Sequence, residues 1–299
     1  MSVETFVSVG NVLQPSAGTL LRRRIFGHTT FLIGAAIFAF ILAVAAFAPW
    51  LAPHDAYAQD LSQRLVPPVW DDGGSWLHPL GTDQLGRDYL SRLIYGSRIS
   101  LLVGFSVMIM SGIIGTTLGV VAGYFGGRVD LVINFIVTTR LAMPVILVAL
   151  TVAALAGSSL ENVILVLGLL LWDRFVVVTR SATLQIRALD YVSAAQSVGC
   201  STSRIVFTEI LPNVLNAIII IGTIEMANGI LLAAALSFLG LGVPPPLPDW
   251  GAMIADGKQY MFFNPWVITI PGVALFALVL AINLLGDGVR DLTAPENRN

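Results

Sequence analysis

Long apolar runs, separated by short polar stretches, dominate the chain of 299 residues. A helix that crosses the hydrocarbon core of a bilayer needs about 20 apolar residues, and runs of that length can be read six times. Backbone polar groups must be paired within lipid, which favours helices over open strands. The predicted spans are residues 29–50, 99–124, 131–156, 160–178, 214–241 and 266–285. The pattern therefore predicts an all-α integral membrane protein with six transmembrane helices.

The distribution of charge predicts an orientation for these helices. Arg22, Arg23 and Arg24 precede the first run without a neighbouring acid, which places the N-terminus in the cytoplasm by the positive-inside rule. Six spans return the C-terminus to the same side. We expect cytoplasmic tails at 1–28 and 293–299, a first helix with an external loop at 29–98, and a main transmembrane domain at 99–292. The loop carries four arginines, but long loops constrain orientation weakly.

Composition adds to the membrane assignment and argues against an enzyme. Only 11% of the residues are charged, and 56% are hydrophobic. The chain has no phosphate-binding loop of the form Gly, four residues, Gly-Lys-Ser/Thr. The three histidines, His28, His54 and His78, are too scattered to suggest a metal site by spacing. We expect no catalytic residue, cofactor, metal or nucleic-acid partner.

One polar stretch, residues 190–213, differs from the apolar remainder of the chain. Small Ala194 and Ala195 would let a short helix approach a partner closely, and Gly199 provides the positive φ that ends such a helix. Ser201 can cap the next helix. Pro212 needs no backbone N–H at the start of the following span, so we expect the elbow to stop sharply there. This stretch predicts a docking element for another protein.

The same stretch carries a family resemblance. Ala194-Ala195-x-x-x-Gly199 followed by Leu211-Pro212 is similar to the signature of ABC-importer membrane subunits. Further motifs in fixed order at 78–88, 236–242 and 271–291 make residues 29–292 resemble the second permease subunit of dipeptide and oligopeptide importers. The resemblance implies a core of five helices plus an N-terminal helix and external loop. It implies a coupling loop at about 180–212, for which we select Asp190, Tyr191, Ala194, Ala195, Gly199, Arg204, Leu211 and Pro212.

The resemblance also implies partners and a location. These are a homologous second permease, two cytoplasmic ATPase subunits, an external substrate-binding protein and the lipid bilayer of a bacterial inner membrane. Three positions depart from the family pattern: Ser193 stands where Glu is frequent, and Thr138 and Ala233 stand where acids are frequent. Peptides, nickel chelates, opines and saccharides remain alternative substrates.

Charges within the predicted spans mark candidate pathway residues, because each is costly at mid-membrane. Arg140 and Glu225 lie at similar predicted depth and could form a buried pair or line the pathway. A secondary transporter that uses them as a proton or sodium relay is the alternative to an ABC permease. Asp173 and Arg174 are expected to reach the cytoplasmic surface.

Small residues recur every four positions in the second span, at Ser111, Gly115, Gly119 and Gly123. Such a ladder allows close helix packing, either within this bundle or against a sister subunit. A purely structural membrane scaffold would also use such ladders. Just before this span, the period of residues 86–95 predicts a separate interfacial helix.

Overall fold

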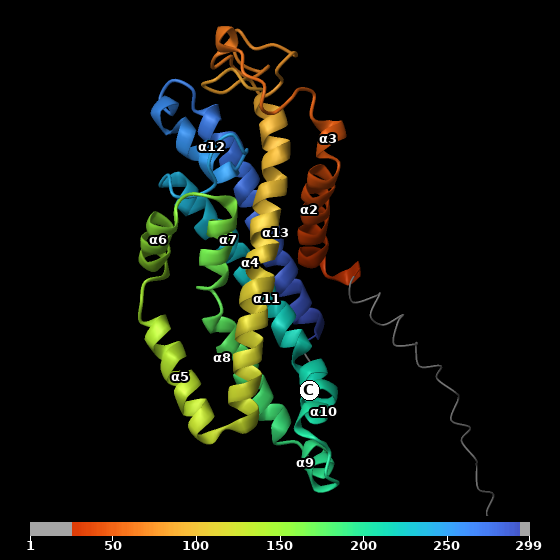
Figure 1. The fold of residues 1–299 in the computed structure, drawn as a ribbon. Coiled ribbons are helices and arrows are strands. Elements are labelled where there is room, and N and C mark those ends of the chain that lie inside the picture. The colour runs from red at the N-terminus through yellow and green to blue at the C-terminus, as the bar shows by residue number, and fades with distance from the viewer. Residues whose placement is uncertain (1–25, 294–299) are drawn as a thin grey trace, which may run out of the picture.

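The computed structural model describes residues 26–293, which form a bundle of helices (Figure 1). Within that range the only strand-like pairing is an isolated bridge between Thr82 and Asp88. The helices are α2 (Thr29–Ala46), α3 (Ala48–Leu51), α4 (Tyr89–Phe125), α5 (Gly127–Leu141), α6 (Val145–Ala156), α7 (Leu160–Gly168), α8 (Asp173–Arg187), α9 (Asp190–Ser197), α10 (Thr202–Ile205), α11 (Leu211–Phe238), α12 (Trp250–Gly257) and α13 (Trp266–Thr293). Short 3-10 turns lie at Leu61–Gln63 and Lys258–Tyr260. The expected tails at 1–28 and 293–299 lie almost entirely outside the described residues.

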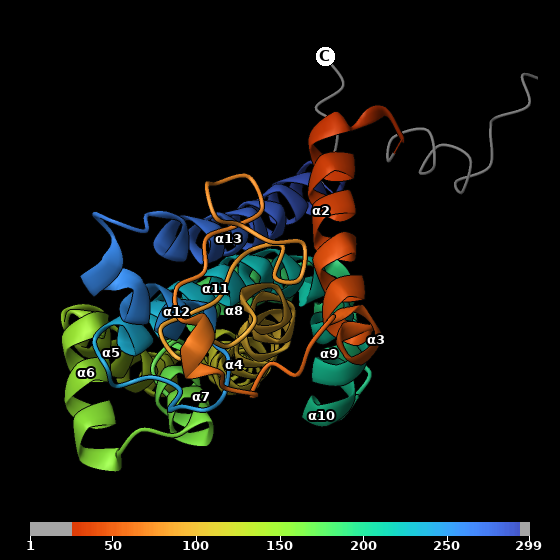
Figure 2. The ribbon, with the colours of Figure 1, turned by 90° about the horizontal axis from the view of Figure 1, so that it is seen from above.

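Five stretches of helix are long and apolar enough to cross a membrane, and α5 with α6 would make a sixth if the bent pair counts as one span. The predicted all-α fold with multiple spans is confirmed. Seen from above, α2 lies at the opposite edge of the bundle from α5 and α6 (Figure 2). It packs on α13, where Gly34 meets Leu284 and Gly288 meets Phe31.

The second span begins earlier than predicted. Helix α4 starts at Tyr89, because the Asp88 carboxylate accepts a hydrogen bond from the Ser91 backbone N–H at 2.8 Å and caps the helix. The prediction of a separate interfacial helix at 86–95 is therefore wrong, since its apolar face continues into the span. The predicted boundary between 98 and 99 falls inside this helix.

Two of the predicted spans are broken. The chain turns by 84° between α5 and α6, next to Pro144, whose ring disfavours helical geometry in the residue before it. The fourth span consists of α7 and α8 with an interruption at residues 169–172. The second break frees the backbone carbonyl of Leu170 from helical hydrogen bonding and places Arg174 in the first turn of a new helix.

The predicted sharp stop at Pro212 is also wrong. Helix α10 continues through a π-helical segment (Val206–Ile210) directly into α11. Proline lacks a backbone N–H and its ring crowds the carbonyl of the preceding turn, and a wider π-helical turn relieves that crowding without ending the helix.

The glycine ladder of α4 packs against α8 of the same chain. A Cβ on Gly115 would lie 2.3 Å from the Trp172 carbonyl oxygen, and one on Gly119 would lie 1.9 Å from Thr179 Oγ1. A Cβ on Gly123 would lie 2.7 Å from the Cβ of Thr183. Ser111, at the head of the ladder, is buried and donates its hydroxyl to the Val107 carbonyl. Helices α4 and α8 therefore touch backbone to backbone along this line.

Candidate functional site

The residues selected for coupling lie at one end of the molecule, on and around α9, opposite the α3–α4 segment (residues 52–88) (Figure 1). Val192 is fully buried and packs in an apolar cluster with Ile205, Ile210 and Val214. The two neighbours of Val192 in the chain, Tyr191 and Ser193, are exposed instead. The helix is thus anchored to the bundle by one side and free on the other.

The turn after α9 has the predicted geometry. Gly199 has a φ of +84°, and a Cβ there would meet nothing within 4 Å in the described structure. The Ser201 hydroxyl accepts a hydrogen bond from the Arg204 N–H at 3.4 Å and caps α10. Val198, directly before Gly199, is 84% exposed. The positive φ and the serine cap are confirmed, and the space around Gly199 leaves room for a partner.

The other selected residues surround this turn. Asp190 lies exposed in the first turn of α9, where a negative charge favours the helix dipole. Ala194, Arg204 and Pro212 are exposed, whereas Ala195 and Leu211 are partly buried. Asn213 Nδ2 donates to the Tyr191 hydroxyl at 3.3 Å and links α9 to the start of α11. The structure brings these residues to one surface, and their role in coupling stays a prediction.

The in-span charges lie together in a polar cavity between α5, α8 and α11. Arg140, Asp173, Arg174, Glu225 and Asn228 line it. Glu225, although fully buried, pairs through Oε1 with Arg174 Nη1 at 3.2 Å, and Asn228 Nδ2 donates to the same oxygen at 3.2 Å. The cavity wall thus holds a buried ion pair with one exposed member, the Arg174 side chain.

Of the two alternatives for Arg140 and Glu225, the direct pair is contradicted. Arg140 Nη2 donates instead to the Leu170 carbonyl oxygen at 2.5 Å. The interruption after α7 leaves that carbonyl without a helical partner, and it also presents Arg174 from the first turn of α8 toward Glu225. Arg140 and Glu225 still share the cavity, as their similar predicted depth suggested.

The expectation that Asp173 and Arg174 reach the cytoplasmic surface is wrong. Asp173 is 5% exposed and Arg174 lines the cavity beside Glu225, because the helix restarts at Asp173 in the middle of the span rather than near its end. A second ion pair was not foreseen: Arg180 Nη2 bonds Asp130 Oδ2 at 2.6 Å and ties α8 to α5. The two residues are 50 positions apart, and no spacing in the sequence signals their contact.

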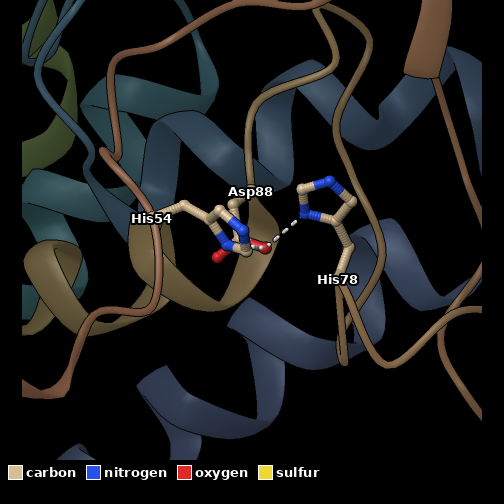
Figure 3. A group of neighbouring side chains, drawn as sticks. All are labelled: His54, His78 and Asp88. Carbon is tan, nitrogen blue, oxygen red and sulfur yellow. Dashed lines mark hydrogen bonds and ion pairs between the residues drawn. The ribbon is translucent and has the colours of Figure 1, made fainter.

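The α3–α4 segment holds a further polar group. His54 and His78 are both close to the Asp88 carboxylate, with ring centroids 4.8 Å apart (Figure 3). Two of the three histidines thus meet in space, although their spacing in the sequence does not indicate it. Next to them, Asp83 forms buried ion pairs with Arg87 at 2.6 Å and Arg92 at 3.3 Å, so the segment is closely tied to the start of α4.

Comparison with known proteins identifies the family. Residues 115–299 match the family described as binding-protein-dependent transport system inner membrane component, and residues 16–68 match the N-terminal transmembrane domain of oligopeptide transport permease C. The chain is 40% identical to the di/tripeptide transport system permease protein DppC of Pseudomonas aeruginosa over 92% of this chain and 91% of that protein. It is 44% identical to the dipeptide transport system permease protein DppC of Escherichia coli K12 over 88% of each.

A solved structure shares the fold. The methionine ABC transporter MetNI, in an inward-facing conformation, superposes with a TM-score of 0.57 over 69% of this chain and 98% of that chain, at 21% identity. The family expected from the motifs is thus confirmed by relatives along nearly the whole chain. The chain belongs to the family of inner membrane components of binding-protein-dependent transport systems.

Proposed function

We propose that this chain is a permease subunit of an ATP-driven ABC importer and forms half of a pathway for dipeptides or similar short peptides. Two relatives named for dipeptide or di/tripeptide transport, at 40% and 44% identity, support the substrate class. The polar cavity at the break between α7 and α8 supports it as well, because a peptide carries a carboxylate that the exposed guanidinium of Arg174 could meet.

The second half of the pathway would come from a homologous permease. Helices α5 and α6 stand at one edge of the bundle (Figure 2), and their apolar side chains include Leu131, Phe135 and Leu155, which are 70%, 69% and 84% exposed. A sister bundle on this edge would cover them and close the cavity. The division into an N-terminal arm at 29–98 and a transport core at 99–292 belongs to the same proposal.

The surface of α9 is the observation that carries the assignment to an ATP-driven importer. It combines a buried anchor, Val192, with an outward face and a glycine turn that leaves open space. ATP hydrolysis is assigned to two separate subunits that dock here, and an external binding protein would deliver the peptide at the opposite end. Both chain termini and α9 would then be cytoplasmic in a bacterial inner membrane, in line with the arginines at 22–24.

The test places single cysteines at the two ends of the molecule. In a Cys200→Ser background, Val198→Cys should cross-link to an ATPase subunit in the assembled complex, and Ser75→Cys, which is also exposed but lies in the α3–α4 segment, should not. A membrane-impermeant thiol reagent applied from outside should label only the second variant. Proteoliposomes with all subunits should take up a labelled dipeptide only with ATP inside.

The opposite results would refute the proposal. Cross-linking at residue 75 but not at 198 would remove the docking surface from α9. Uptake by this chain alone, driven by a proton or sodium gradient, would instead identify a secondary carrier.

A further inference from the structure

The α3–α4 segment brings three metal-ligating side chains together at the N-terminus of α4. One ligand atom each from His54, His78 and Asp88 lies within 4.8 Å of the others. Asp88 Oδ1 is 2.8 Å from His78 Nδ1 and 3.6 Å from His54 Nδ1 (Figure 3). The Asp88 and His78 side chains are 1% and 11% exposed, whereas that of His54 is 34% exposed. The cluster is therefore held inside the segment with one side accessible.

The hydrogen bonds within the described residues do not satisfy all the polar atoms of the cluster. His78 Nε2 lies 3.0 Å from Gln63 Oε1, and its Nδ1 faces Asp88 Oδ1, so both ring nitrogens face acceptors. A neutral imidazole can donate through only one nitrogen, and donation to Gln63 leaves a lone pair on Nδ1 pointing at the carboxylate. A protonated imidazole at this position would satisfy both oxygens.

Protonation of His78 still leaves the second histidine unexplained. His54 Nδ1 is buried and has no hydrogen-bond partner among residues 26–293, although it is directed toward the same carboxylate oxygen. A cation shared by the two Nδ1 atoms and Oδ1 accounts for both rings at once. A buried polar atom without a partner calls for an explanation, and for His54 Nδ1 the nearby carboxylate oxygen and the second imidazole supply one in a shared cation.

We propose that His54, His78 and Asp88 bind one divalent transition-metal ion, with Zn²⁺ as the best match. Zinc bonds nitrogen and carboxylate oxygen at about 2.0–2.1 Å, so tetrahedral ligand atoms lie about 3.3 Å apart. The observed separations of 2.8 Å and 3.6 Å fall on either side of that value. Water would complete the coordination on the exposed side of His54.

The surrounding contacts are those that orient metal ligands. The hydrogen bond from His78 Nε2 to Gln63 fixes the ring with Nδ1 toward the metal, as outer partners of zinc-bound histidines do. Asp88 Oδ2 is held by the Ser91 N–H, which leaves Oδ1 for the ion. The ion would join residues 54 and 78 to the first turn of α4 and so fix the segment on the bundle. This inference does not rest on the proposed transport function.

The test measures zinc binding by the full chain, purified in detergent with a tag free of histidine. After treatment with a chelator, zinc is titrated against a chromophoric competitor in a Cys200→Ser background. We expect one equivalent in this background protein. His54→Gln and Asp88→Asn should each weaken binding at least tenfold, and Gln63→Ala, which removes only the outer contact, should weaken it by about tenfold.

The controls separate lost binding from lost folding. Asn at position 88 keeps a side-chain oxygen for the Ser91 N–H, so the metal-free variant should keep the melting temperature of the metal-free parent. His28→Gln changes the third histidine, which lies 3.1 Å from Asp291 far along the chain, and it should retain the full equivalent. Zinc should raise the melting temperature of the parent and of His28→Gln, but not of His54→Gln.

Two results would overturn the site. One is the absence of a zinc equivalent in the parent, or its survival in both His54→Gln and Asp88→Asn. The other comes from X-ray absorption on the zinc-loaded parent, which does not depend on any variant: two imidazole ligands are expected, and a shell without imidazole contradicts the proposal.

Discussion

The pair of Glu225 and Arg174 predicts an unequal response to removal of its two members. The carboxylate side chain is fully buried, whereas the arginine side chain is 56% exposed. Arg174→Met leaves a buried carboxylate with only Asn228 as a partner, but Glu225→Gln leaves an arginine that can turn to solvent. We therefore expect the arginine substitution to be the more destabilising of the two.

The size of the effect follows from the separation of 3.2 Å between Arg174 Nη1 and Glu225 Oε1. At an effective dielectric constant of 20, the Coulomb energy of such a pair is about 5 kcal/mol. The exposure of the arginine reduces this by solvent screening, which leaves a coupling of about 1–3 kcal/mol. Breaking a fully buried pair costs about 3–5 kcal/mol. We therefore expect a loss of stability of about 2–4 kcal/mol for Arg174→Met and about 1 kcal/mol for Glu225→Gln. The double variant should lose only slightly more than Glu225→Gln alone, because it leaves no unpaired carboxylate.

Thermal unfolding of the purified chain in detergent provides the assay, with melting temperatures compared across the single and double variants. Arg140 supplies a matched control, because it lines the same cavity but bonds the Leu170 carbonyl. Arg140→Met and Glu225→Gln should therefore show a smaller coupling than the Arg174–Glu225 cycle. Additive losses for the Arg174–Glu225 cycle, or strong coupling in the Arg140–Glu225 cycle, would refute the arrangement of charges described above.

Three further predictions concern packing, the turn and a buried acid. Gly119→Ala, whose Cβ would lie 1.9 Å from a hydroxyl oxygen of α8, should destabilise by about 1–3 kcal/mol, whereas Gly272→Ala, at an open helical position of α13, should stabilise by about 0.5–1 kcal/mol. Equal melting temperatures for the two variants would contradict the close contact of α4 and α8. Gly199→Ala should cost about 1 kcal/mol through its positive φ, and Gly199→Asn less. Gly199→Leu should show less ATP-coupled uptake than Gly199→Ala, because its larger side chain would fill the space proposed for the partner. Equal uptake by the two variants would argue against docking at this turn. Burial raises the pKa of Asp249, which caps α12. The ionised carboxylate therefore lowers the stability of the fold at neutral pH, and this penalty fades as the pH falls toward the ordinary pKa of an aspartate. Asp249→Asn keeps the cap and should gain more in melting temperature at pH 7 than at about pH 4, near the ordinary carboxyl pKa, and a gain independent of pH would contradict a buried carboxylate.

The sequence predicts those features that depend on local chemistry. Run length and hydropathy locate the apolar spans, although not their breaks or exact ends, because the bilayer sets a minimum length for each. The positive φ at Gly199 and the cap at Ser201 follow from the properties of single residues. The coupling signature also lies within one short stretch, so its residues reach one surface without any long-range information.

The features that sequence reasoning missed depend on contacts between distant segments. Depth counted along straight helices paired Glu225 with Arg140, and the interruption after α7 changed the partner to Arg174. The meeting of His54 with His78 requires the path of the whole α3–α4 segment. The π-helical segment before α11 absorbs a proline that local rules treat as a stop.

Helix α8 connects the proposed coupling surface to the polar cavity. Its 15 residues span about 22 Å, from Arg174 beside Glu225 to the short link that leads into α9. The glycine ladder of α4 leaves no free space along its side, since a Cβ on Gly119 would already collide with it. A close-packed contact of this kind transmits displacement rather than absorbing it. We therefore expect that movement of α9 by an ATPase would shift α8 and α4 together and act on the Arg174–Glu225 pair. Variants of the glycine ladder, such as Gly119→Ala, should then impair ATP-coupled uptake while ATPase binding persists.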